Sequence, residues 1–440
     1  MNKLLTEKAL GEIILSPFIK FFNSQSLAGV LLLITTVLAL LWANSPWASE
    51  YHQLWNYHIG IQSDSFEIIK PLILWVNDGL MAVFFFMIGL EIKRELQIGE
   101  LNSPKKAALP FIAALGGMLV PVGFFFLLNN NSETATGWGI PIATDIAFSL
   151  AILKALGKRI PLGVKVFLTA FAIVDDLGAV LVIALFYSSG IDWTLVIYGL
   201  VIFTFLLFLS KKGIYSKYLT LLSGAIVWLL FLKAGIHPTF AGVLLAFAVP
   251  VRQKLGLTEF NTKLKVHLEG LKNSNRTNSP ILTNEQMIHV DNIDQLTSKV
   301  YSPLQHLEAQ IHPWVAYLII PIFALANAGI TFSYDIHLDV NLLYSIGIAL
   351  VFGKTIGISL FTGIAVMLGI ADIPEKVSRL QIIGVSVIAG VGFTMSIFIA
   401  NLAFNGQEKY MDSAKMGIFI GSIIAAVLSY LIFKMSKAKK

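Results

Sequence analysis

Two things are scarce in this sequence, cysteine and charge. None of the 440 residues is cysteine, which excludes disulfide bonds, a thiolate nucleophile and a cysteine-ligated metal site. Charged residues make up only 13% of the chain and hydrophobic residues 56%, whereas soluble domains contain roughly 25% charged residues. This composition predicts a polytopic membrane protein. The net charge of +6 does not indicate nucleic-acid binding, because basic residues of membrane proteins mostly mark cytoplasmic loops.

Motifs of intramembrane enzymes are missing as well. A prenyl-transferring enzyme that binds Mg-diphosphate would need DDxxD, but Asp175 and Asp176 are followed by Leu-Gly-Ala. The GxGD motif of aspartyl membrane proteases does not occur. Residues 1–25 also lack the clean apolar core of a cleavable signal. We expect this segment to lie at the membrane interface as an amphipathic helix, or to form a disordered tail as far as Ile13.

Apolar runs of membrane-spanning length recur along the chain. A transmembrane helix needs about 20 predominantly apolar residues. The runs predict an all-α polytopic membrane protein with twelve transmembrane helices. The expected spans are residues 26–46, 71–92, 107–128, 138–155, 163–187, 193–210, 216–234, 236–252, 312–332, 341–370, 379–404 and 414–434.

Basic residues are distributed unevenly between these spans. The connections at 129–137, 188–192 and 333–340 contain no Lys or Arg, while alternate connections are rich in them. The positive-inside rule makes the basic connections cytoplasmic. An even number of spans then places both termini on that side. The basic residues concerned are Lys93, Arg94, Lys105, Lys106, Lys154, Lys158, Arg159, Lys165, Lys211, Lys212, Lys217, Lys376, Arg379 and those of 252–310.

Two connections are much longer than the others. In the external one, 47–70, Tyr57–Ile61 could pair with Phe66–Ile69 as a β-hairpin, or the whole connection could be an irregular loop. The cytoplasmic one is polar and rich in Asn and Ser, which favours partial disorder, but its later part, 287–300, could be a short amphipathic helix. The expected organisation is an interfacial segment 1–25, spans 1 to 8 in 26–252, a polar insert 253–309, and spans 9 to 12 in 310–437.

Asp175 and Asp176 are adjacent carboxylates in the middle of the fifth apolar run. A charge near the bilayer centre costs at least about 3 kcal/mol, and such residues by default mark ion or proton pathways. A helix completes a turn in 3.6 residues, so the two side chains point in different directions. We expect one to face an aqueous cavity and the other to face a neighbouring helix.

Two other runs are interrupted near their centres. Pro141, Thr144 and Asp145 interrupt the fourth, and Gly390 and Gly392 interrupt the eleventh. Irregular backbone at membrane depth is tolerated only where it is buried in protein or lines a cavity. Interrupted segments in corresponding places of two halves indicate a transporter site. They predict inverted repeats formed by spans 3–5 and 10–12. The alternative for the fourth run is a Pro-kinked span with an Asp at its mouth.

Three further ionisable residues are candidates for function. Lys354 lies inside the tenth span, where it needs a carboxylate partner such as Asp175 or Asp176, unless it snorkels to the cytoplasmic face. Glu91 is a candidate acid at the mouth of a cytoplasmic funnel. His312 could titrate near neutral pH, or could be an interfacial polar residue.

Six strings of the sequence are distinctive in content, order and spacing. They are VNDGLMAVFFFMIGLEIKREL, IPIATDIAFSLAIL, FLTAFAIVDDLGAVLVIALFY, IHPWVAYLIIPIFALANAGI, GKTIGISLF and GVGFTMSIFIANLAF. Together they resemble the bacterial NhaA-type sodium/proton antiporters. The resemblance covers about 15–250 and 305–435, and the insert between them is longer than we expect for the family.

The resemblance implies a fold and a set of roles. Spans 4 and 11 would be discontinuous helices that cross near the membrane midplane. Asp176 would be the principal cation ligand and proton carrier, with Asp175 as its partner at the transported Na⁺. Thr144 and Asp145 would lie at the break of span 4. Lys354 would pair with Asp175 and offset the negative ends of the broken helices, while Asp145 would offset the positive ends.

The resemblance also implies regulation and assembly. Glu91, Glu308 and His312 match positions that are tied to the pH response in the family. The external hairpin in 47–70 would join two protomers into a homodimer. The protein would be a multi-pass component of the bacterial inner membrane, embedded in the lipid bilayer.

Competition at a buried carboxylate would explain exchange. Such a group can hold a proton or a small alkali cation, but not both, and Na⁺ or Li⁺ prefers oxygen ligands such as Asp176, Asp145 and Thr144. Alternating access then gives antiport without a cofactor, and several titrating groups per cation would make it electrogenic. A channel would not need Lys354 opposite the acids. A sodium-coupled symporter on the same fold is the nearest alternative, and would need a pocket for an organic substrate.

Overall fold

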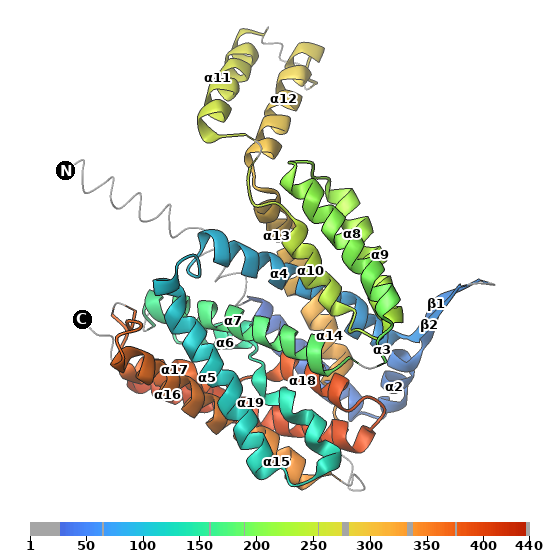
Figure 1. Cartoon of the computed structure of the whole chain (residues 1–440), viewed down its shortest axis with the longest axis vertical. Coiled ribbons are helices and arrows are strands. Elements are labelled where there is room, and N and C mark those ends of the chain that lie inside the picture. Colours follow the sequence, from blue (N-terminus) through green and yellow to red (C-terminus); the bar gives the residue numbers. More distant parts are fainter. Residues whose placement is uncertain are drawn as a thin grey trace.

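The computed structural model describes residues 27–63, 66–157, 160–188, 190–253, 255–274, 281–331, 338–374 and 376–436. Within these ranges the chain is a bundle of helices with one two-stranded sheet (Figure 1). The expected interfacial segment 1–25 lies outside the described residues, as do Lys158, Arg159 and the C-terminal residues 437–440.

Eight helical stretches in the described ranges are long and apolar enough to cross a membrane. Three of them contain a short π-helical segment, which gives the composites α3–η1–α4, α13–η4–α14 and α15–η5–α16. The single helices are α5 (Pro104–Leu128), α7 (Leu162–Phe186), α8 (Trp193–Lys211), α9 (Lys217–Ala234) and α19 (Glu408–Met435). The composites consist of α3 (Leu72–Leu74), η1 (Trp75–Leu80) and α4 (Met81–Ile98); α13 (Pro303–Trp314), η4 (Val315–Ile319) and α14 (Ile320–Asn327); and α15 (Val340–Ile348), η5 (Ala349–Gly353) and α16 (Lys354–Met367).

Three apolar helix pairs are bent at a short break. The helix Leu27–Ala43 and α2 (Ala48–Asn56) meet at 112°, η2 (Ser132–Ile142) and α6 (Ile146–Ala155) at 49°, and α17 (Arg379–Ile388) and α18 (Phe393–Ala403) at 42°. Counting each pair as one span gives up to eleven spans in the described residues.

The eighth expected span is represented by α10 (Thr239–Ala248). Its 10 residues extend about 15 Å, half of the roughly 30 Å hydrocarbon core. The structure is therefore an all-α polytopic membrane protein, while the number twelve stays a prediction.

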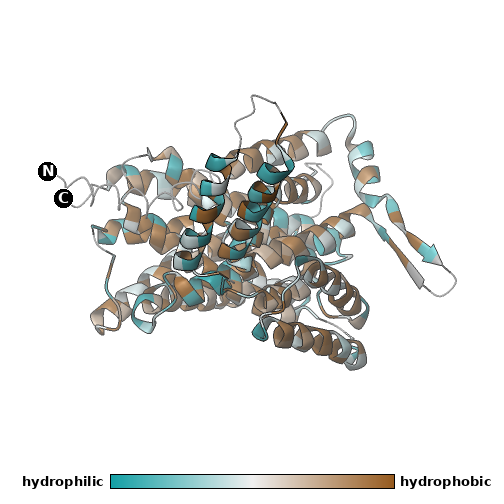
Figure 2. Ribbon diagram, turned by 90° about the horizontal axis from the view of Figure 1, so that it is seen from above, coloured by the Kyte–Doolittle hydropathy of each residue, from teal (hydrophilic) through white to brown (hydrophobic). Residues whose placement is uncertain are grey.

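Two elements extend from the helical body. β1 (His58–Ser63) and β2 (Phe66–Pro71) pair antiparallel with Ile61 opposite Ile68, and form a projecting hairpin (Figure 1). The expected hairpin is thus present, although α2 precedes it in the segment expected to be part of a loop. The polar insert forms α11 (Leu257–Asn273), where we expected partial disorder, and α12 (Asn284–Val300), which confirms the helix expected over 287–300. Their hydrophilic residues stand out against the hydrophobic bundle (Figure 2).

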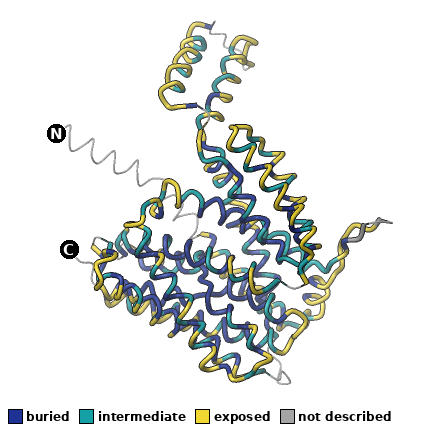
Figure 3. Tube along the Cα trace, in the orientation of Figure 1, coloured by how far each residue is buried: buried dark blue, intermediate teal, exposed yellow. Residues whose placement is uncertain are grey.

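Burial is concentrated in the middle of the body, around α7 and α18 (Figure 3). Glycines permit close helix contacts there. A Cβ on Gly357 of α16 would lie 2.1 Å from the carbonyl oxygen of Gly116 on α5, and a Cβ on Gly116 would lie 2.3 Å from the carbonyl oxygen of Gly357. Such backbone approach is typical of helix packing in membranes, where small residues form the interfaces.

Candidate functional site

Helix α7 carries Asp175 and Asp176 into the centre of the bundle, where both are buried. Lys354, at the start of α16, donates to both oxygens of Asp175, at 3.0 Å to Oδ1 and 2.7 Å to Oδ2. It also donates to Oγ1 of Thr144, at 3.1 Å. Lys354 is 0% exposed, so it does not snorkel. The structure therefore brings the lysine to one acid of the pair and leaves the other acid facing elsewhere.

The break between η2 and α6 contacts the break between α17 and α18. The Asp145 N–H donates to the Val391 carbonyl at 2.7 Å, and the Thr144 hydroxyl donates to the Ala389 carbonyl at 2.9 Å. Gly392 makes the approach possible, because a Cβ there would lie 3.0 Å from the Ala143 carbonyl oxygen. Unpaired backbone groups at the breaks of η2–α6 and α17–α18 thus satisfy each other inside the protein, as membrane depth requires.

Pro141 and Gly390 flank this contact without joining the charged cluster. Pro141 is buried in η2, the 3₁₀ helix that precedes the first break. Gly390 packs against the η5 backbone, since a Cβ on it would lie 2.5 Å from the Leu350 carbonyl oxygen. Both therefore act on the shape of the break.

The Asp145 side chain lies at the N-termini of two helices. Its Oδ1 accepts from the Phe148 N–H of α6 at 3.0 Å. Its Oδ2 accepts from the Thr394 N–H at 3.1 Å and from the Thr394 hydroxyl at 2.5 Å, both on α18. A carboxylate at this place caps the free N–H groups and offsets the positive ends of both helix dipoles. No local pattern in the sequence indicates this role of Thr394, since its contact with Asp145 depends on the fold.

Asp176 differs from Asp145 and Asp175 in its hydrogen bonding. Within the described residues its Oδ1 is buried without a hydrogen-bond partner. It faces a narrow cavity whose polar walls are Asp176, Glu91, Thr144, Asp145 and Thr394. The remaining lining side chains are apolar, namely Phe84, Met87, Ile88, Ile146, Ala147, Ile320 and Met395. A buried polar atom without a partner is costly, so this oxygen is the natural place for a proton or a cation.

A charge cluster lies at the Glu91 end of the cavity. Arg94 contacts three acids, at 3.9 Å to Glu91, 2.8 Å to Glu95 and 3.0 Å to Glu308. The structure thus brings together two of the three residues expected to respond to pH. His312 lies four residues after Glu308, one turn further along α13, and is half-buried. From the sequence, Arg94 is predicted only to mark a cytoplasmic connection, because nothing in the sequence shows that Glu308 lies beside it.

These features define a class. A membrane-embedded helix bundle in which two bent helix pairs meet beside buried carboxylates and a buried lysine has the architecture of a secondary transporter. A family described as Na⁺/H⁺ antiporter 1 matches residues 19–433. The chain belongs to this family.

Individual relatives match over almost the whole chain. The Na⁺/H⁺ antiporter NhaA of Oleidesulfovibrio alaskensis is 44% identical over 428 residues, which cover 96% of this chain and 94% of the relative. The antiporter of the same name from Parabacteroides distasonis is 43% identical, with 96% of both chains covered. That of Wolinella succinogenes is 43% identical over 94% of this chain and 91% of its own.

Proposed function

We propose that this protein is a Na⁺/H⁺ antiporter that also accepts Li⁺, and that H⁺ and the cation compete for buried carboxylates. The observation that carries the proposal is Asp176, a buried acid that lines the cavity and has an oxygen without a hydrogen-bond partner among the described residues. Family membership and the names of the relatives support the choice of ions.

Asp176 is the proposed cation ligand and proton carrier, with Asp175 as its partner at the transported Na⁺. Asp145 and Thr144 line the same cavity and offer further oxygens. In the described part of the chain, no group of three or more His, Asp or Glu side chains is placed to hold a metal ion. The cation would therefore need hydroxyl, backbone or water oxygens beside the carboxylates. Such a weak, mixed site suits an ion that must leave again.

Lys354 and Asp145 are proposed to compensate charge. Lys354 lies against Asp175 and against Thr144, whose hydroxyl donates to the Ala389 carbonyl after α17. Lys354 is thus connected to the negative end of α17 through a single residue, Thr144. Asp145 accepts from the N-termini of α6 and α18. A broken helix without such compensation would leave partial charges of about half an elementary charge inside the membrane.

The proposed topology has twelve spans, with α10 and its flanks as the eighth. Spans 3–5 would be α5, η2–α6 and α7, and spans 10–12 would be α15–α16, α17–α18 and α19. Each triplet has one bent pair between two long stretches, which supports inverted repeats and a crossing of spans 4 and 11 near the midplane. Both termini and the insert 253–309 would then be cytoplasmic, in a bacterial inner membrane, after the interfacial segment 1–25.

We propose that transport is electrogenic and regulated by pH. Asp175 and Asp176 lie in one site, so more than one proton can be exchanged per cation. Glu91 lines the cavity through which ions would pass, and Arg94 connects it to Glu308. Together with His312 they form the proposed pH-responsive group. The hairpin in 47–70 is the proposed contact of a homodimer.

Everted membrane vesicles test the proposal. Addition of Na⁺ or Li⁺ to vesicles with an imposed ΔpH should dissipate that gradient, measured with a fluorescent amine over a range of pH. Asp176→Asn should abolish the response, because an amide cannot exchange a proton for a cation. Asp294→Asn, on exposed α12, is the matched control and should respond like the wild type. Full exchange by Asp176→Asn would refute the assignment, and no response of the wild type at any pH would favour a symporter.

A further inference from the structure

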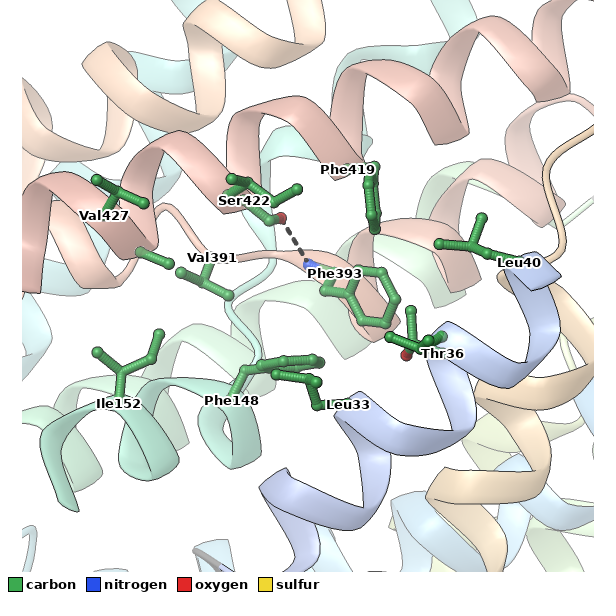
Figure 4. A pocket seen from close by; sticks show the side chains of 13 residues that line it. Leu33, Thr36, Leu40, Phe148, Ile152, Val391, Phe393, Phe419, Ser422 and Val427 are labelled. Atoms are coloured by element: carbon green, nitrogen blue, oxygen red, sulfur yellow. Dashed lines mark hydrogen bonds between the residues drawn. The ribbon is translucent and has the colours of Figure 1, made fainter. Parts of the chain in front are cut away.

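An apolar groove lies directly behind the helix break (Figure 4). Its walls come from the helix Leu27–Ala43, from α6, from the break before α18 and from α19. It contains about 280 Å³ of space, close to the lower end of the volumes of ligand pockets, roughly 300 Å³. It does not overlap the cavity at Asp176, because the two share no lining residue.

The groove offers no hydrogen bonds. Only carbon atoms are exposed along its walls. Two hydroxyls stand among the lining residues, and both are already engaged. The Thr36 hydroxyl donates to the Leu32 carbonyl at 2.7 Å, and Ser422 Oγ accepts from the Phe393 N–H at 3.3 Å (Figure 4). An ion, a sugar or a lipid headgroup would lose its own hydrogen bonds here. The chemistry of the walls therefore selects hydrocarbon.

The mouth of the groove continues into the lipid-facing surface of the bundle. Leu33 and Val37 on one wall are 52% and 45% exposed, and Ile423 and Val427 on the other are 49% and 53% exposed. In a membrane the surroundings of these side chains are acyl chains. Since an empty apolar cavity forfeits dispersion contacts on its whole lining, an acyl chain that enters from the bilayer gains them without desolvating any polar group.

We propose that this groove is a binding site for one acyl chain of a bilayer phospholipid. The floor of the groove gives the chain a role. Phe393 packs edge-on against Phe148, with ring centroids 5.1 Å apart. The Phe148 N–H donates to Asp145 Oδ1, and Thr394, next to Phe393, donates to Asp145 Oδ2. A chain that presses on these two rings holds the segments that position Asp145. This coupling to transport rests on the proposed function, whereas the binding does not.

Photolabelling tests the binding directly. The full-length protein is reconstituted in phosphatidylethanolamine and phosphatidylglycerol vesicles that contain a trace of phosphatidylcholine with a diazirine on its acyl chain. After irradiation, mass spectrometry of peptides should find adducts on Phe148, Phe393 or Phe419. Ala426→Trp, which fills the groove from α19, should lose these adducts. Ile424→Trp places the same indole side chain at an exposed position of α19 outside the groove, and should keep them.

Several outcomes would overturn the proposal. Groove adducts that are absent in the wild type, or unchanged in Ala426→Trp, exclude an acyl chain. Adducts that appear only after removal of residues 1–25 identify that segment as the occupant, and adducts that increase only on dilution of the protein identify a second copy. If Ala426→Trp does not reach the membrane, Leu33→Trp fills the groove from the opposite wall. A loss of adducts without any change in Na⁺-dependent exchange would leave the binding intact and refute the coupling to Asp145.

Discussion

The three buried acids of the site differ in how each is satisfied. Asp175 has a lysine against both oxygens, and Asp145 has two helix N-termini and a hydroxyl. Asp176 keeps an oxygen that has no hydrogen-bond partner in the described part of the chain. Asp176 is therefore the acid that can take a new occupant without breaking an existing contact, whereas Asp175 can do so only by separating from Lys354. A site in which all three acids were paired would hold its charges permanently, and one in which none was paired would not be stable at this depth.

Thr394 gives a test of this arrangement at a single residue. Thr394→Val keeps the shape of the side chain but removes the hydroxyl that donates to Asp145. A hydrogen bond to a charged group is worth about 1.5–3 kcal/mol, so the apparent affinity for Na⁺ should fall by about tenfold or more. The measurement is the Na⁺ concentration for half-maximal ΔpH dissipation. Thr394→Ser retains the hydroxyl and is expected to stay close to the wild type; equal losses in both variants would contradict the role of the hydroxyl.

At the scale of elements, the contact between α5 and α16 determines where Lys354 stands, since Lys354 is the first residue of α16. The two backbones touch through Gly116 and Gly357, with no side chain between them. Lipid offers helices no hydrophobic incentive to associate, so this close packing supplies most of the attraction. The position of the lysine thus depends on a glycine contact one turn away.

Gly357→Ala should therefore destabilise the protein. Its Cβ would lie 2.1 Å from a carbonyl oxygen that cannot move without displacing α5. Overpacking of this kind costs about 1–3 kcal/mol, which thermal unfolding in detergent would register as a lower midpoint. Gly363→Ala on the same helix is the control, because a Cβ there meets nothing within 4 Å. If the two variants melt together, the contact is looser than the structure shows.

Elements also mark the limit of prediction from sequence. The sequence predicts the spans from their long apolar runs and the candidate site from the charges inside those runs, because both signals are local. α10 is too short to count by length, and the π-helical segments η1, η4 and η5 leave no periodic signal. Thr394 was not identified as the partner of Asp145, because a hydrogen bond between residues 249 positions apart depends on the fold. Arg94 lies only one turn from Glu91, but its contact with Glu308, 214 positions away, depends on the fold in the same way.

At the scale of the whole molecule, the hairpin raises a question of stability. A two-stranded sheet is marginal on its own in water, and this one projects from the body (Figure 1). Ile59 and Ile61 alternate onto one face of β1 and are 46% and 72% exposed. Apolar side chains on a projecting strand favour a cover, and the same hairpin of a second protomer is the cover that the proposed homodimer provides.

Ile61→Lys should convert the dimer into a monomer, because a lysine on this face would have to be desolvated against its symmetry mate, and charge at a sheet edge opposes association. Light scattering after size exclusion in mild detergent measures the change in mass, and crosslinking in vesicles checks it in a membrane. Gln62→Lys places the same charge on the opposite face of β1 and should remain dimeric. Na⁺-dependent ΔpH dissipation should persist in both variants, since Asp176 and its cavity lie within one chain. A dimeric Ile61→Lys protein would place the contact between protomers elsewhere on the surface.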